Sequence, residues 1–204
     1  MKITAIKQQV RNPQRVSLFV DGKYEFSLSL DELLKEGLKN GAELEVADVK
    51  RLKKLSADGK LRTRALEWLL NRPRSERKFR DYLYRKKAEP EQIERLVEEF
   101  TGKGYLDNFK FAQWFVELQA RRAKSDRAIR AELFKKGISR EIADEVLGEN
   151  MGDEVERLKK IIEKKQKLSR YKNDTQRLVK YLTSQGFSWS LVKETLRTNF
   201  PDES

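Results

Sequence analysis

Residues 15–30, RVSLFVDGKYEFSLSL, alternate between apolar and polar side chains on both sides of Asp21-Gly22. A period of two is typical of a β-strand with one buried face, and Asp-Gly is a frequent turn between two strands. This pattern predicts a β-hairpin. The stretch from Lys2 to Gln9 is a candidate third strand of the same small sheet.

The length of the hairpin loop decides which side chains share a face of the sheet. A two-residue Asp21-Gly22 loop places Leu18 on the face opposite Tyr24 and Phe26. A three-residue loop, Val20 to Gly22 with Gly22 in the left-handed conformation, pairs Leu18 with Tyr24 and Val16 with Phe26 on one apolar face. We expect this second register.

Beyond the hairpin, the pattern becomes helical. Ser29-Leu30-Asp31-Glu32 has the sequence of a capping box, which opens a short helix that Gly37 ends. After Gly41, apolar residues recur at the spacing of one helix face. The first of these are Val49, Leu52, Leu55, Leu61, Ala65, Leu66 and Leu69. The sequence therefore predicts a small N-terminal β unit followed by an all-helical remainder.

The helical part repeats itself with a shift of fifty residues. The first copy contains Leu61, Ala65, Leu66, Trp68, Arg72, Ser75, Phe79, Arg80 and Leu83, which superpose on Phe111, Phe115, Val116, Leu118, Arg122, Ser125, Ile129, Arg130 and Leu133 of the second. A looser third copy places Asn173, Leu178, Leu182, Gly186, Phe187 and Leu191 on Ser125, Ile129, Leu133, Gly137, Ile138 and Ile142, with one residue inserted after the cap.

Each copy has the pattern of three helices. Ser75, Ser125 and Asn173 are the predicted N-caps of the middle helices, and each is followed by a carboxylate that suits the positive end of the helix dipole. Gly137 and Gly186 are expected to end the second and third middle helices, whereas the first ends at Ala88, before Pro90. The stretches 102–107 and 148–153 each end one helix and cap the next.

The predicted fold class is mainly α: three tandem three-helix repeats that form an elongated, curved rod, preceded by a small β-hairpin or sheet unit. We expect the β unit with its short helix in residues 1–46 and the three repeats in residues 47–103, 104–150 and 151–204.

Charge is the strongest compositional feature of the chain. Its 204 residues include 45 Lys and Arg against 33 Asp and Glu, a formal charge of +12. A field of this sign attracts polyanions or acidic protein surfaces. Cys and His are both absent, which removes thiol nucleophiles, the usual neutral-pH base and the standard zinc ligand sets. No phosphate-binding or nucleophile motif is present, so we expect no enzyme, no cofactor and no metal.

Location follows from hydropathy and from cysteine usage. The start, MKITAIKQQV, lacks the apolar core of a signal peptide, and no run reaches the roughly 20 apolar residues of a membrane span. The absence of Cys suits a reducing compartment. We expect a cytoplasmic monomer that does not bind membranes.

Positive charge is sorted by helix along the repeats. The middle helices and the segments before them are basic, whereas the third helices of the first two copies are acidic. This sorting predicts a cationic side that recurs with each copy and follows a polyanion; six neutralised phosphates would give a log–log salt slope of about −5. The candidate contacts are Arg72, Arg74, Arg77, Arg80, Lys124, Arg127, Arg130, Lys172 and Arg177.

Other interpretations of the same residues stay open. The cations also fit an ordinary solvated helix face, or ion pairs between neighbouring copies. Tyr84, Phe134, Trp114 and Trp189 have the chemistry to stack on bases, but their helical spacing favours core positions. The copies resemble three-helix DNA readers in outline, yet their acidic third helices do not suit a recognition helix.

Three phrases of the sequence are similar to those of one family. RPRSERKFRDYLYRKK (72–87), GYLDNFKFAQWFVE (104–117) and SDRAIRAELFKKGIS (125–139) resemble RecX, the bacterial regulator of RecA recombinase, in that family's order. Lys87-Ala88 differs from the usual Lys-Gly ending. The resemblance implies a non-enzymatic protein of DNA repair and recombination that binds in the groove of a RecA–DNA filament. It would limit filament assembly, ATP hydrolysis, strand exchange and co-protease action.

Two functions compete with that expectation. An autonomous helical-repeat protein would bind the DNA phosphate backbone without sequence preference and without RecA. An adaptor for some other protein would need neither DNA nor RecA. The sequence itself does not decide which cations contact DNA and which contact protein.

Overall fold

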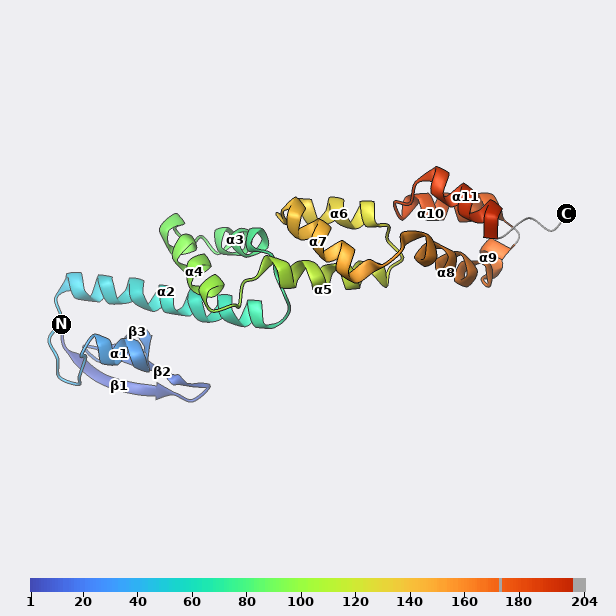
Figure 1. The fold of residues 1–204 in the computed structure, drawn as a ribbon. Coiled ribbons are helices and arrows are strands. Elements are labelled where there is room, and N and C mark those ends of the chain that lie inside the picture. The colour runs from blue at the N-terminus through green and yellow to red at the C-terminus, as the bar shows by residue number, and fades with distance from the viewer. Residues whose placement is uncertain (173, 200–204) are drawn as a thin grey trace. The chain divides into compact units, whose positions relative to one another are not determined.

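The computed structural model describes residues 1–172 and 174–199, and this part is mainly helical with an N-terminal sheet, as predicted (Figure 1). The strands are β1 (Ile3–Gln9), β2 (Asn12–Val20) and β3 (Lys23–Ser29). The helices are α1 (Leu30–Lys35), α2 (Val46–Leu70), α3 (Glu76–Arg85), α4 (Pro90–Gly102), α5 (Asn108–Ala120), α6 (Asp126–Lys135), α7 (Arg140–Met151), α8 (Glu154–Gln166), α9 (Ser169–Lys172), α10 (Thr175–Ser184) and α11 (Trp189–Asn199).

The sheet is antiparallel in the order β1-β2-β3, so the third strand is confirmed. The predicted register is wrong. Val20 pairs with Lys23 across a two-residue turn in which Asp21 and Gly22 have φ values of 48° and 81°, typical of a type I′ turn. A bulge then shifts β3, so that Leu18 pairs with Phe26 instead of Tyr24.

The bulge explains how a short turn still produces one apolar face. Phe19 pairs with Tyr24 and Leu18 with Phe26, so Glu25 is the extra residue of β3. Leu18 and Phe26 are 0% and 2% exposed, whereas Tyr24 is 50% exposed. The bulge therefore restores a single apolar face, with Phe26 and not Tyr24 opposite Leu18.

The β unit is closed by α1 and by the first half of α2. Ser29 Oγ accepts from the Glu32 N–H at 3.1 Å and Glu32 Oε2 accepts from the Ser29 N–H at 2.7 Å, which confirms the capping box. Val49 and Leu52 of α2 pack into the sheet core with Val16, Leu18, Val20, Phe26 and Leu28. The sequence patterns of period two and period 3.6 thus meet in one apolar layer.

In chain order the longer helices form three triplets, α2–α3–α4, α5–α6–α7 and α8–α10–α11, with the short α9 between α8 and α10. The second triplet packs around Phe111, Phe115, Ile129, Leu133, Ile138, Val146 and Leu147. The third packs around Leu158, Ile162, Tyr171, Leu178, Leu182, Phe187, Val192 and Leu196. Equivalent apolar positions of the predicted repeats therefore fill equivalent cores.

Caps at the middle helices agree with two of the three expectations. Ser75 Oγ accepts from the Lys78 N–H at 3.3 Å, and Ser125 Oγ from the Ala128 N–H at 3.2 Å. Asn173, the cap expected for the third copy, lies outside the described residues. The N-cap of α10 is Asp174, whose carboxylate accepts from the Arg177 N–H at 2.8 Å.

The helix ends show one further correction. Gly137 and Gly186 follow α6 and α10 with positive φ, as expected for C-terminal glycines. At the end of α3 the left-handed residue is Lys87, with φ 59°, and not Ala88. Lys87 is exposed, and it lies fifty positions before Gly137.

The described chain divides into two compact units, Met1–Asn71 with Leu83–Leu96, and Arg72–Tyr82 with the residues from Val97 onward. Helices α3 and α4 contribute to both units. The expected division into one β unit and three repeats stays a prediction, as does the curved rod. Within residues 1–172 and 174–199, no helix is both long and apolar enough to cross a membrane.

Candidate nucleic-acid interface

The middle helices of successive triplets meet end to end. The Ser125 N–H, which begins α6, donates to the carbonyl oxygen of Gln185, which ends α10, at 3.1 Å. The partial charges at these two helix ends have opposite sign, so this order is favourable. A Cβ on Gly186 would lie 2.6 Å from the Ala128 Cβ. The close approach therefore requires glycine at that position.

The preceding junction has the same construction. Gly137, at the end of α6, lies against Arg77 in the first turn of α3, and a Cβ there would come within 2.8 Å of the Arg77 Cβ. Gly137 and Gly186 thus each allow a middle helix to approach closely, at equivalent positions of successive triplets. Arg77 is therefore both a predicted contact residue and a packing partner of Gly137, although most of Arg77 is exposed.

A second repeated contact joins the first two middle helices, α3 and α6, to the triplet that follows each of them. The Glu76 N–H donates to Asn108 Oδ1 at 3.0 Å, and the Asp126 N–H donates to Glu154 Oε1 at 2.8 Å. Arg157 of α8 also forms an ion pair with Asp126. Free N–H groups at the start of α3 and α6 are thereby satisfied within the protein, which leaves anion binding to side chains.

A basic groove lies among the segment before α3, α5 and α6. Its cavity volume is about 350 Å³, and it is lined by Arg72, Pro73, Arg74, Lys78, Phe111, Trp114, Phe115, Leu118, Gln119, Arg122, Glu132 and Lys136. The lining has five cations and one carboxylate. A cavity with walls of one sign concentrates the field and raises the local density of anions.

Cations in the basic groove lie over aromatic rings. The Arg72 guanidinium carbon is 5.7 Å from the ring centroid of Trp114, and Lys136 Nζ is 5.0 Å from that of Phe115. Contacts of this kind hold a cation in place while leaving its hydrogen-bond donors for another partner. Burial, followed by repulsion from Arg72, holds the pKa of Arg74 below its ordinary value.

Only Arg72 and Arg74 of the nine candidates line this groove, while Lys78, Arg122 and Lys136 were not among them. One signal in the sequence could have indicated Arg122, because it lies fifty positions after Arg72. Lys78 and Lys136 are ordinary helix-surface residues in the sequence. Their proximity depends on how α3 approaches α5 and α6.

Two other candidates are engaged in ion pairs. Arg80 Nε lies 2.8 Å from Glu76 Oε1, and Arg130 Nε lies 2.7 Å from Asp144 Oδ1. Asp144 also lies 3.5 Å from Arg140. The hydrogen bond from Arg130 is the largest cause that lowers the pKa of Asp144; desolvation opposes it, and the charges of Arg130 and Arg140 lower the pKa further. Intramolecular pairing, which the sequence left open, therefore applies to these two cations.

The remaining candidates lie on the surfaces of the second and third triplets. Arg127, Lys172 and Arg177 are exposed, and Lys124 is partly buried. Lys172 borders a separate cavity with Glu163, Gln166 and Lys167. The structure does not collect these residues into one site. They are dispersed over these surfaces, and their role as electrostatic contacts stays a prediction.

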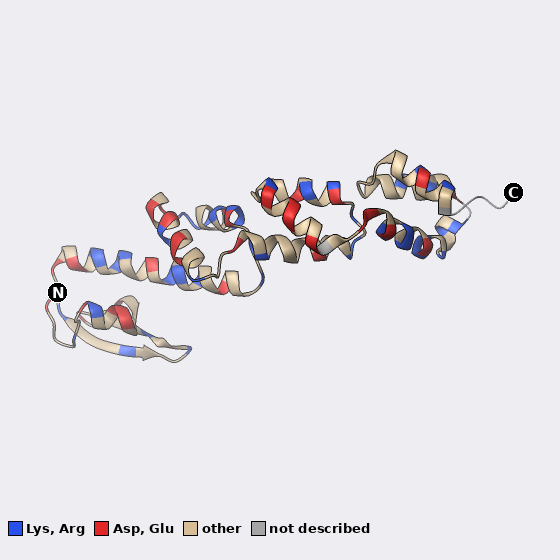
Figure 2. Cartoon of the chain, viewed as in Figure 1, with Lys and Arg blue, Asp and Glu red and all other residues tan. Residues whose placement is uncertain are grey.

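The sorting of charge by helix is visible in Figure 2, where red predominates on α4 and α7 and blue on α8. The acidic helices partly neutralise their own triplets, as the Arg130–Asp144 pair illustrates. Helix α8 adds Lys159, Lys160, Lys164 and Lys165 in the third triplet. Basic residues therefore outnumber acidic ones in the lining of the basic groove and on α8, although Lys78 also pairs with Asp81 and Lys159 with Glu156.

The aromatic residues differ from expectation. Tyr84, Phe134 and Trp189 are 59%, 42% and 63% exposed, so core positions were the wrong expectation for these three. Trp114 is partly buried and packs against the second core. Of the three exposed rings, that of Trp189 has a cation over it, Lys193, which is a feature of surfaces that bind single-stranded nucleic acid.

Fold and surface together define a basic helical-repeat protein with an N-terminal sheet. Residues 1–45 match the family model described as Regulatory protein RecX N-terminal domain, and residues 107–147 match RecX, second three-helix domain. The regulatory protein RecX of Listeria monocytogenes is 32% identical over 95% of this chain and 74% of its own length. That of Clostridium tetani is 31% identical over 96% and 93%.

Solved structures agree with these relatives. A crystal structure of regulatory protein RecX is similar with a TM-score of 0.71 and 25% identity, over 96% of this chain and 98% of the other. RecX from Lactobacillus salivarius has the same fold, with a TM-score of 0.58 over 69% and 95%. The chain belongs to the RecX family of regulatory proteins, which are not enzymes.

Proposed function

We propose that this protein binds the RecA–DNA filament in the bacterial cytoplasm and restrains it. The activities restrained are filament assembly, ATP hydrolysis, strand exchange and co-protease action. The proposal is supported by membership of the RecX family and by the basic groove with its five lining cations. The groove is the single observation that links the family to a physical means of binding a polyanion.

The repeated junctions support binding to a target that itself repeats. Gly137 and Gly186 fix neighbouring triplets at close range, so the cations carried by those triplets keep a regular spacing. A nucleoprotein filament presents phosphates and acidic side chains at regular intervals. A monomer with repeated cations can therefore contact several of its subunits at once, which raises the overall affinity without any single strong contact.

The candidate residues have graded roles in this proposal. Arg72, Arg74 and Arg122 in the basic groove are the main contacts, because their positive charge greatly exceeds the one carboxylate nearby. Arg127, Lys172 and Arg177 add dispersed contacts. Arg80 and Arg130 contribute least, since a phosphate would compete with Glu76 and Asp144 for them.

A titration of RecA ATPase on single-stranded DNA tests the proposal. Substoichiometric wild-type protein should lower the rate, and the triple variant Arg72→Glu/Arg74→Glu/Arg122→Glu should need at least about tenfold more protein for the same effect. A control triple variant, Lys39→Glu/Lys50→Glu/Lys54→Glu, makes the same charge change at exposed positions of the other compact unit. It should behave nearly as wild type.

Three outcomes would overturn the proposal or its assignment to the basic groove. Absence of any effect on ATPase at every ratio would remove RecA as the partner. Tight DNA binding without RecA, combined with unaltered ATPase, would instead favour the autonomous DNA-binding function. Equal loss in the two triple variants would show that net charge, and not the basic groove, carries the interaction.

A further inference from the structure

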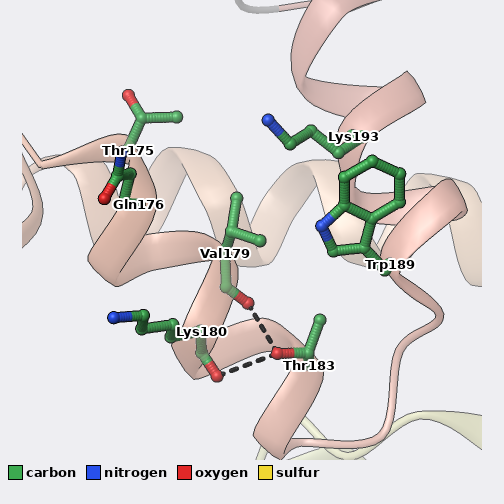
Figure 3. Close-up of a pocket in the computed structure, with 7 residues that line it drawn as sticks. All are labelled: Thr175, Gln176, Val179, Lys180, Thr183, Trp189 and Lys193. Atoms are coloured by element: carbon green, nitrogen blue, oxygen red, sulfur yellow. Dashed lines mark hydrogen bonds between the residues drawn. The ribbon is translucent and has the colours of Figure 1, made fainter.

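A second groove lies between α10 and α11 in the third triplet (Figure 3). Its volume is about 360 Å³, toward the lower end of the roughly 300–1,000 Å³ typical of small-ligand sites. We call it the third-triplet groove; it is lined by Thr175, Gln176, Val179, Lys180, Thr183, Trp189 and Lys193. The nine candidate contacts include none of these residues, and neither family match covers them.

Comparison with the second triplet explains why this groove is open. The third copy follows the second at an offset of 49 residues, as Ile129 and Leu178 illustrate. At this offset Arg130, Arg140 and Asp144 correspond to Val179, Trp189 and Lys193. The first three form an ion cluster in the second triplet, with distances of 2.7 and 3.5 Å to the Asp144 carboxylate.

The third triplet replaces that whole cluster by different chemistry. An arginine becomes apolar, a second arginine becomes a tryptophan, and the shared carboxylate becomes a cation. Lys193 Nζ lies 5.5 Å from the Trp189 ring centroid, and Trp189 stays 63% exposed. Figure 3 shows the indole and both lysines around Val179. The change therefore turns a closed ion-paired surface into an open one with an aromatic wall.

Polar groups of the groove are arranged for an anionic ligand with an apolar part. Thr183 Oγ1 donates to the backbone, with carbonyl oxygens of Val179 and Lys180 at 3.0 and 3.1 Å, so its hydroxyl is occupied and its methyl remains for the groove. The lining contains two lysines and no carboxylate. Gln176 supplies an amide that can donate or accept.

We propose that the third-triplet groove binds one unstacked nucleotide of a single-stranded nucleic acid. The base stacks on Trp189, while Lys180 and Lys193 contact the flanking phosphates. A duplex does not fit this chemistry, because its bases are already stacked. An acidic peptide would satisfy the lysines, but aspartate and glutamate side chains offer no aromatic ring to stack on the indole. The inference does not depend on RecA, and its test contains none.

The test is intrinsic tryptophan fluorescence of the full chain, titrated with oligothymidylate of about twelve nucleotides. A probe of equal length without bases keeps the phosphates and removes stacking. Oligothymidylate should quench the emission of Trp189, which is identified as the part of the emission that the Trp189→Leu variant lacks. The abasic probe should not quench it. Equal quenching by the two probes would overturn the stacking contact, because phosphates alone would then account for binding.

Matched variants distinguish binding at the third-triplet groove from binding by cations or aromatic rings elsewhere on the protein. Trp189→Leu should weaken oligothymidylate binding about fivefold or more, since stacking one base contributes at least that much. Tyr84→Ala removes an equally exposed ring elsewhere and should change affinity less than twofold. Lys180→Gln/Lys193→Gln should weaken binding more than Lys160→Gln/Lys164→Gln, which makes the same charge change on exposed positions of α8.

Three results would contradict the inference. Equal weakening by Trp189→Leu and Tyr84→Ala would assign binding to dispersed aromatic contacts, and equal weakening by the two lysine pairs would assign it to dispersed charge. Third, an acidic peptide of equal length that quenches Trp189 more strongly than oligothymidylate would assign the groove to a protein partner. Each result is independent of whether the ATPase titration succeeds.

Discussion

Gly186 lies directly against the first turn of α6, where a Cβ on the glycine would be 2.6 Å from the Ala128 Cβ. Its φ of 100° is also unfavourable for any side chain. Two independent physical requirements therefore converge on one residue. The same combination, at φ 81° and 2.8 Å from the Arg77 Cβ, occurs at Gly137.

Gly186→Ala should lower the free energy of unfolding of the helical part by roughly 2–4 kcal/mol, because left-handed strain and steric overlap add. Chemical denaturation followed by circular dichroism measures this. Gly104→Ala is the matched control, since Gly104 has φ 71° but no atom within 4 Å of the added Cβ. Equal losses in the two variants would show that strain alone matters and that the junction tolerates a methyl group.

Lys87→Gly should stabilise the protein by about 1 kcal/mol. Lys87 has φ 59°, a conformation that costs an ordinary residue roughly 1–2 kcal/mol. Glycine adopts this conformation without strain, but its greater conformational entropy in the unfolded state offsets part of the stabilisation. The measurement is the midpoint of thermal unfolding. Lys86→Gly, one residue earlier, should instead destabilise, so a loss of stability in both variants would contradict the argument.

Arg72→Gln should reduce the slope of log affinity against log salt for DNA by about 1, the value expected when one phosphate contact is lost. Arg80→Gln should change the slope less, because Glu76 already holds that guanidinium at 2.8 Å. Fluorescence anisotropy at several salt concentrations provides both slopes. A larger change for Arg80 would place the phosphate contacts on α3 and not in the basic groove.

The carboxyl of Asp144 should titrate below the usual aspartate range, and Arg130→Gln should raise its pKa, because the hydrogen bond from Arg130 is the largest cause of the shift. A lowered native pKa means that the contact stabilises the fold above the ordinary aspartate pKa. This contribution is lost as pH falls through the lowered value. NMR titration of the side-chain carboxyl carbon measures the effect, and an unchanged pKa in the variant would contradict it.

Local sequence rules predicted most of the elements. The capping box at Ser29, the Ser75 and Ser125 caps and the glycines after α6 and α10 depend on backbone conformation, which a few neighbouring residues decide. The hairpin register failed because the bulge at Glu25 compensates for a short turn, and the alternation of side chains alone does not reveal an extra residue.

The binding surface was less predictable for a related reason. Charge counts correctly indicated an excess of cations, but they could not show that Arg80 and Arg130 face carboxylates while Lys78 and Lys136 approach Arg72. Exposure of Trp189 was also missed, because helical spacing places it beside core residues. The sequence did contain a signal for the third-triplet groove: the ionic residues of the second copy are replaced by Val179, Trp189 and Lys193 at the equivalent positions of the third.

The middle helices α3, α6 and α10 differ in the residue of positive φ that follows them, which is Lys87 after the first and a glycine after the other two. Gly137 and Gly186 each admit the preceding middle helix because they lack a side chain. A helix that packed against the end of α3 in the same way would meet the Lys87 side chain. A further triplet placed ahead of the first would therefore have to displace that side chain, a cost that the two glycine junctions do not carry.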